Sequence, residues 1–122
     1  MKRRYRVQKN QHFQEIRRNG HSYSNKLVVL CVLPNKLTHN RFGFSVSRRI
    51  GNAVTRNKVK RRLREIMRLR LESIKPGYDI VLIARQSTRN ATYQELEIAC
   101  ARLLRRAHLL RRDVDSGMNK AE

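Results

Sequence analysis

The residues best suited to chemistry in this sequence are the arginines and lysines between positions 48 and 70. Eight arginines and two lysines stand there against a single acid, Glu65. Guanidinium and ammonium groups bind phosphate through charge-assisted hydrogen bonds, whereas like charges four residues apart on a helix repel each other. Solvated charged faces normally mix both signs, so this density of cations predicts a polyanionic partner. Charge alone favours RNA over DNA only slightly.

The element that must position these cations is an amphipathic helix. Its apolar residues recur at i, i+4, i+7 and i+8, the spacing of a core-facing stripe, and are Val59, Leu63, Ile66 and Met67. On the opposite side, within about 60° of arc, lie Asn57, Arg61, Arg64 and Arg68. We call these last four residues the basic rail. A turn at Gly51 and Asn52 leads into the helix, which we expect to continue to about Leu71.

Groups for intrinsic catalysis are scarce. A protein-only metal nuclease gathers carboxylates around divalent ions, but Asp113 and Asp115 fall in an expected tail and Asp79 is isolated at the start of a strand. Glu65 is best interpreted as an ion-pair partner of a neighbouring arginine. The four histidines show no ligand spacing, and we interpret Cys31 and Cys100 as buried, reduced thiols. The sequence therefore predicts neither a catalytic residue nor a metal site in the protein.

The composition limits the class of protein further. The 122 residues suit one domain, expected over 1–115 with a disordered tail at 116–122, and the formal net charge is +20 with 29 basic and nine acidic residues. Such a charge favours binding to nucleic acid or to an anionic membrane. The longest apolar run, Leu27 to Leu33, is far too short to span a bilayer. No apolar segment follows Lys2 to Arg4, so we expect no signal peptide and a cytoplasmic location.

The remaining elements predict an α+β fold of helices packed on a small sheet, in the order α-β-β-α-β-α. After a basic arm over residues 1–9, we expect a short helix at 10–19, ended by Gly20, and a polar connection at 21–26. Strands are expected at 26–33 and 41–47, forming an antiparallel hairpin, and at 78–84 in the sheet centre. Thr92 to Glu95 has a capping-box pattern, followed by apolar helical spacing to Leu110.

The second of these strands has one face suited to a ligand. Phe42, Phe44 and Val46 alternate with small or polar residues. Because neighbouring side chains of a strand point to opposite faces, the face with Gly43, Ser45 and Ser47 would be open.

Taken together, these residues resemble a known family, the bacterial ribonuclease P protein subunit. The segment from Arg48 to Glu65, RRIGNAVTRNKVKRRLRE, is similar to the family's "RNR" signature. The resemblance continues before it, in Asn10-x-x-Phe13 with Gly20, and after it, in Tyr78-Asp-Ile-Val through Ala84-Arg85.

The resemblance implies a ribonucleoprotein endonuclease that removes 5′ leaders from precursor tRNA. The RNA subunit would be the catalyst, with Mg²⁺ held mainly by that RNA and by substrate phosphates. The implied partners are the catalytic ribonuclease P RNA and precursor tRNA, with no membrane and no required protein partner. The resemblance also implies a left-handed βαβ crossover, where general chain rules lead to a right-handed one.

The resemblance assigns two RNA surfaces by position. The surface for the catalytic RNA comprises Arg56, Asn57, Lys58, Lys60, Arg61, Arg62, Arg64 and Arg68. A central cleft between the first helix and the sheet would hold the single-stranded leader, with Phe13, Arg17, Ser47, Arg48, Asn52 and Arg85.

Some positions depart from the family pattern. Arg17 stands where a second aromatic is common, Ser47 and Gln86 stand where some relatives carry a cation, and Lys58 replaces the last arginine of the motif. Lysine keeps the charge of that position but loses the bidentate geometry of arginine. Two alternatives stay open from the residues alone: a basic ribosomal or chromatin-like binding protein, and a stand-alone nuclease.

Overall fold

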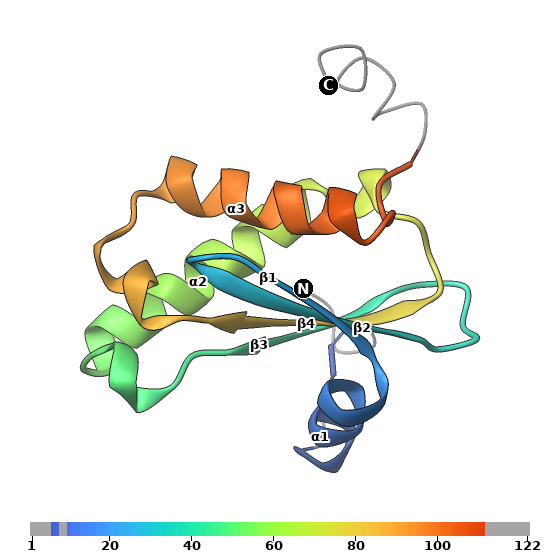
Figure 1. The fold of residues 1–122 in the computed structure, drawn as a ribbon, viewed down its shortest axis with the longest axis horizontal. Helices are drawn as coiled ribbons and strands as arrows, with labels where there is room; N and C mark the ends of the chain where they lie inside the picture. The colour runs from blue at the N-terminus through green and yellow to red at the C-terminus, as the bar shows by residue number, and fades with distance from the viewer. Residues whose placement is uncertain (1–5, 8–9, 112–122) are drawn as a thin grey trace.

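The computed structural model describes residues 6–7 and 10–111, which form three α-helices and a four-stranded sheet (Figure 1). The α+β prediction is therefore confirmed. In chain order, the elements are α1 (Asn10–Asn19), β1 (His21–Ser24), β2 (Val28–Pro34), β3 (Arg41–Ser45), α2 (Ala53–Leu69), β4 (Tyr78–Ala84) and α3 (Tyr93–Arg106). Short 3-10 turns are η2 (Arg48–Ile50), η3 (Leu71–Ser73) and η4 (Gln86–Asn90). Most of the expected arm at 1–9, Asp113, Asp115 and the expected tail lie outside the described residues.

The strand order of the sheet is β1-β2-β4-β3, with β3 and β4 parallel and the other pairs antiparallel. The predicted antiparallel hairpin of β2 and β3 is wrong, because β4 lies between them. The apolar run Ile80 to Ile83 explains this arrangement, since a strand buried on both faces is most stable with a neighbour on each side. The central position predicted for this strand is confirmed. Helix α2 links the parallel strands as a βαβ crossover, whose hand stays a prediction.

Strand β1 is a second difference from the sequence-based expectation, which had a polar connection at 21–26. The segment His-Ser-Tyr-Ser pairs antiparallel with β2, with Tyr23 opposite Leu30. Only Tyr23 of this strand is partly buried. The strand is thus stabilised by backbone pairing at the sheet edge and has no apolar alternation that a sequence pattern would reveal.

The helices cover the two faces of the sheet unequally (Figure 1): α2 and α3 lie on one face and α1 on the other. The main core under α2 and α3 takes Leu30, Phe42 and Leu82 from the strands, together with the stripe Val59, Leu63, Ile66 and Met67. The smaller cluster under α1 contains Val7, Ile16, Cys31 and Val81. Since α1 is only ten residues long, it covers part of its face. No described helix has the length and apolar character needed to cross a bilayer.

The ends of α2 and α3 are fixed by side-chain and backbone caps. The side-chain oxygen of Asn52 accepts a hydrogen bond from the Thr55 amide, and Thr92 and Glu95 form the predicted capping box. Helix α2 ends at Leu69, near the expected end. The apolar spacing predicted a helix that continues to Leu110, but α3 ends at Arg106.

A backbone motif ends α3 at that point. His108 adopts φ 57°, and the amides of His108 and Leu109 donate to the carbonyls of Arg105 and Leu104, the Schellman pattern of a helix end. Leu110 is still buried, but in an antiparallel bridge with Ile74.

Candidate nucleic-acid interface

The basic rail lies along the face of α2 away from the core. Asn57, Arg61 and Arg68 are exposed and Arg64 is half-buried, whereas the apolar stripe opposite is fully buried. Arg68 donates to both carboxylate oxygens of Glu65, at 2.9 and 2.7 Å. This contact raises the pKa of Arg68 and lowers that of Glu65. The ion pair predicted for Glu65 is therefore confirmed.

The rest of the α2 cations keep their charge available. Within residues 6–7 and 10–111, the ion pairs are those of Asp79 and the Arg68–Glu65 pair, so Lys58, Lys60 and Arg61 project without an acidic partner. Arg56 is half-buried. Arg62 has a structural contact, because its Nη1 donates to the Ala91 carbonyl at 3.1 Å and ties α2 to the segment after η4. The structure thus brings all eight predicted catalytic-RNA residues onto one helix, with two of them also engaged within the protein.

The sheet face under α1 carries the strand positions predicted to be open. An added Cβ on the buried Gly43 would lie 2.6 Å from Cζ of Phe13, so the Phe13 ring lies against the bare backbone of β3. The next positions along this face, Ser45 with Ile83 and Val29 in register beside it, are half-buried. Beyond the ring, this face of the sheet is therefore lined by small and apolar side chains that remain partly accessible. We call the surface formed by Ser45, Ile83 and Val29 the floor.

The predicted leader residues come from several elements and do not form one cluster. Phe13 is half-buried in the smaller core, and Arg17 is exposed one helical turn further along α1. Ser47 and Arg85 line a hollow of about 520 Å³ at the carboxyl ends of β3 and β4. Arg48 and Asn52 are exposed but do not line this hollow. The Asn52 side chain is already engaged as the N-cap of α2.

The same hollow contains residues outside the predicted leader set. Lys26 and Arg49 add two cations, and Ser87 and Gln86 add polar groups, while no acid is among its lining residues in the part of the chain described. Arg85 is held in place by a 3.1 Å hydrogen bond from Nη1 to the Asn25 carbonyl. The sequence alone could not place Lys26 in this hollow, because Lys26 comes close to the other lining residues only through the pairing of β2 with β4.

A buried ionic cluster attaches α1 to the sheet and was missed by the sequence reasoning. Asp79 is 1% exposed, and its carboxylate accepts two 2.8 Å hydrogen bonds from Arg41 and one of 3.0 Å from Asn35. Nε2 of His12 lies 2.6 Å from Asp79 Oδ2, so that nitrogen carries the donated hydrogen. Burial opposes ionisation of Asp79, but the hydrogen bonds from Arg41 and Asn35 and the charges of Arg41 and His12 outweigh it and lower its pKa.

Potential metal ligands are not grouped. Among residues 6–7 and 10–111, histidine, cysteine, aspartate and glutamate form no group of three or more that could hold an ion. Cys31 and Cys100 are free and buried, as predicted, and burial raises the pKa of the Cys100 thiol to about 12. The described residues do not fit a magnesium site, which would need several oxygen ligands.

A small α+β domain with a cationic helix on one face and a partly open sheet on the other has the features of a nucleic-acid-binding protein. The family model described as Ribonuclease P matches residues 1–108. The ribonuclease P protein component of Clostridium botulinum (strain 657 / Type Ba4) is 47% identical over 102 residues, covering 83% of this chain and 92% of the relative. That of Clostridioides difficile (strain 630) is 40% identical over 104 residues, covering 84% and 91%.

Solved structures agree with the sequence relatives. The RNase P protein of Staphylococcus aureus superposes with a TM-score of 0.82 at 38% identity, covering 88% of this chain and 98% of that one. The RNase P protein of Thermotoga maritima gives 0.77 at 31% identity, covering 83% and 96%. The chain belongs to the ribonuclease P protein family, whose members are protein components of an endoribonuclease of tRNA processing.

Proposed function

We propose that this chain binds the catalytic RNA of ribonuclease P through α2 and holds the single-stranded 5′ leader of precursor tRNA beside α1. The observation that carries the proposal is the row of exposed cations on α2, opposite a fully buried stripe and with one acidic partner among the described residues. A folded helix that keeps such a row of like charges is stabilised by a polyanion.

The catalytic RNA would contact the exposed cations of α2. Lys58, Lys60 and Arg61 supply charge to phosphates, and Arg64 and Arg68 extend the contact along the helix. Arginine forks bind phosphate oxygens in pairs, so they also fix orientation. Because Arg62 is hydrogen-bonded to the segment after η4, the charged face has a rigid support. Its fixed geometry reduces the entropy lost on binding.

The leader would lie in an extended conformation across the floor beside Phe13. The accessible part of the Phe13 ring offers a stacking surface for an unpaired base, and Arg17 adds charge one turn away. At the far end, Ser47 and Arg85 with the added cations Lys26 and Arg49 offer a site for leader phosphate. Arg48 and Asn52 border the path at the entry to α2. The replacement of a second aromatic by Arg17 makes this contact more electrostatic.

Catalysis would be carried out by the RNA subunit with Mg²⁺. The described part of the chain has no donor set for Mg²⁺, which supports placing the ions on RNA and substrate phosphates. The protein cations would instead lower the repulsion between the phosphates of the two RNAs and so raise the occupancy of those ions at low Mg²⁺.

Reconstitution tests this function. Precursor tRNA, catalytic RNA and low Mg²⁺ are combined with and without the protein, and we expect the protein to accelerate removal of the leader. An unchanged rate would contradict the proposal and favour a binding protein without a role in cleavage. Cleavage by the pure protein without the RNA subunit would assign catalysis to the protein instead. Affinity for the catalytic RNA should also fall with salt, with a log–log slope of about −0.7 to −0.9 per phosphate contacted.

A further inference from the structure

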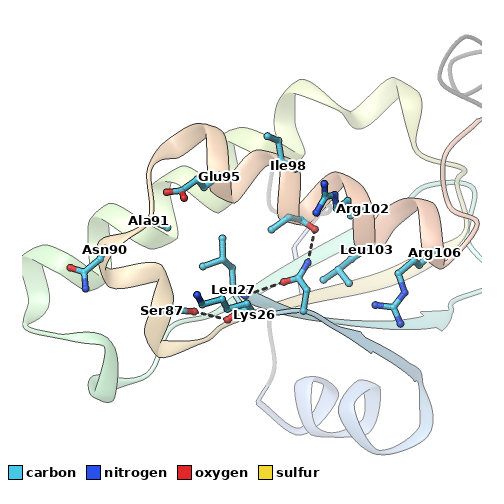
Figure 2. A pocket seen from close by; sticks show the side chains of 12 residues that line it. Lys26, Leu27, Ser87, Asn90, Ala91, Glu95, Ile98, Arg102, Leu103 and Arg106 are labelled. Carbon is cyan, nitrogen blue, oxygen red and sulfur yellow. Dashed lines mark hydrogen bonds between the residues drawn. The ribbon is translucent and has the colours of Figure 1, made fainter. Parts of the chain in front are cut away.

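A hollow of about 640 Å³ lies between α3, the β1–β2 loop and η4, and it shares Lys26 and Ser87 with the hollow proposed above for leader phosphate (Figure 2). Its volume is within the range of ligand pockets in proteins, roughly 300–1,000 Å³. Apolar side chains form much of its lining, among them Leu27, Leu103 and Ile98. Ile98 is 52% exposed although it is a large aliphatic residue on a helix. The hollow therefore offers an apolar surface to a partner.

Cations dominate the charged groups around this surface. Lys26, Arg102 and Arg106 line the hollow with one acid, Glu95. The Glu95 carboxylate already accepts a 2.8 Å hydrogen bond from the Thr92 amide in the capping box. A ligand that fits this lining combines an apolar part with negative charge.

The two arginines that line the hollow differ in how firmly they are held. Arg106 is held in position, because its Nη1 donates to the Ser24 carbonyl at 3.0 Å and its guanidinium lies 6.0 Å from the centre of the Tyr23 ring. Arg102 is exposed, and no residue in the described part of the chain accepts a hydrogen bond from it. One cation is thus preorganised, and the other is free to follow a ligand.

We propose that this hollow binds an unpaired nucleotide of the catalytic RNA, with the base on the apolar surface at Ile98 and the phosphate at Arg102 and Arg106. Proteins recognise unpaired bases by stacking them on aromatic side chains or arginine planes, often beside apolar contacts, and bind their phosphates with arginine. An apolar surface bordered by cations matches both halves of a nucleotide. The proposal rests on the docking of the catalytic RNA on α2.

The contact between α2 and the lining of the hollow favours the catalytic RNA as the occupant, although Lys26 and Ser87 also line the hollow proposed for leader phosphate. Ala91 lines the hollow, and its carbonyl accepts the hydrogen bond from Arg62 of α2. Helices α2 and α3 lie on the same face of the sheet, and α1, beside which the leader would lie, is on the opposite face (Figure 1). An RNA that docks on α2 can therefore continue to the hollow without crossing the sheet.

The test uses two variants of the full chain, each with a matched control. Ile98→Asp removes the apolar surface, and Leu37→Asp makes the same change at another exposed aliphatic residue, 40% exposed, in the β2–β3 loop. Arg102→Gln removes the free cation, and Lys75→Gln removes an exposed cation before β4. Affinity for the catalytic RNA is measured at fixed salt, and chemical probing of that RNA reports protected nucleotides.

We expect Ile98→Asp to weaken binding about tenfold, the order expected when the burial of one aliphatic side chain is lost. Arg102→Gln should reduce the salt slope by about one. Both variants should expose the same unpaired nucleotide to the probe, while the controls bind as wild type and the nucleotides protected by α2 stay protected. Thermal melting checks that Ile98→Asp folds. If that variant does not fold, the result for Arg102→Gln tests the proposal.

Three results would overturn the assignment. In the first, both variants keep the affinity and the RNA protection of the wild type, whereas Arg61→Ala with Arg64→Ala weakens binding. That result would reject the hollow as an RNA site but keep the docking on α2. Another is a loss of affinity for precursor tRNA alone, which moves the site to the substrate. The third is unchanged RNA affinity with loss of capture of another protein, which assigns the hollow to a protein partner. If Arg61→Ala with Arg64→Ala also has no effect, the proposed function itself fails.

Discussion

Nε2 of His12 on α1 lies 2.6 Å from Oδ2 of Asp79, the buried acid at the start of β4. The contact connects the helix that carries Phe13 to the centre of the sheet. Arg41 binds the same carboxylate from β3 through two hydrogen bonds. One buried charge therefore fixes three elements relative to one another.

Replacing Asp79 by Asn should destabilise the protein and change its pH dependence. Breaking a buried pair leaves Arg41 without its counter-ion, and we expect a loss of about 3 kcal/mol in the free energy of unfolding at pH 7. Since the pKa of Asp79 is lowered by folding, its contribution is present above the ordinary aspartate pKa and disappears as the pH falls through the lower, folded value. Denaturant unfolding at pH 7 and at about pH 3 measures both. An equal difference between wild type and variant at the two pH values would contradict this assignment.

Replacing Gly20 by Ala should destabilise the protein for lack of space. An added Cβ would lie 2.5 Å from the Val32 carbonyl oxygen and 2.6 Å from that of Ile16. Both neighbours are backbone atoms, which cannot rotate away. We expect a loss of about 2 kcal/mol or more in the free energy of unfolding, measured by denaturation with urea. Wild-type stability would show that α1 can shift freely on the sheet.

Replacing Phe13 by Ala should weaken binding of precursor tRNA more than binding of mature tRNA. The loss expected for one stacked base is about 1–3 kcal/mol. Because Phe13 also packs in the smaller core, Phe13→Leu serves as the control that keeps apolar contact without the ring. Gly43→Ala should reproduce part of the effect, since its Cβ displaces the ring. Equal losses for both tRNAs would leave Phe13 with a packing role alone.

Replacing Arg61 and Arg64 by Ala together should lower affinity for the catalytic RNA and leave the fold stable. Among the described residues, neither arginine has a hydrogen-bond acceptor, and the helix gains a better helix former at each position. The salt slope should decrease by about two, one per cation removed, in binding measured over a salt series. Arg62→Ala is the contrasting control, because loss of its bond to Ala91 should cost about 1 kcal/mol of stability. A sharp fall in melting temperature for the double variant would show that these side chains support the fold.

Much of the local structure was predictable from the sequence. The helical period separated Leu63 and Met67 from Arg61 and Arg68, and the turn at Gly51 and Asn52 and the capping pattern at Thr92 marked the starts of the two helices. Periodicity and capping act over a few residues, so a linear pattern contains them. The same locality explains the overextended α3, whose apolar spacing continues to Leu110 although the chain turns away at His108.

The pairing of distant segments was decided only by the tertiary structure. Strand β4 lies between β2 and β3, and that register places Arg41 beside Asp79, while the docking of α1 adds His12. The hollow beside α3 likewise gathers Lys26, Ser87 and Arg102 from three separate parts of the chain. The sequence by itself determined which face of each element is apolar and which is charged, because that depends on spacing along the chain. Which of these faces and residues meet depends on the competition among all possible strand and helix partners, and the free energy of the whole fold decides it.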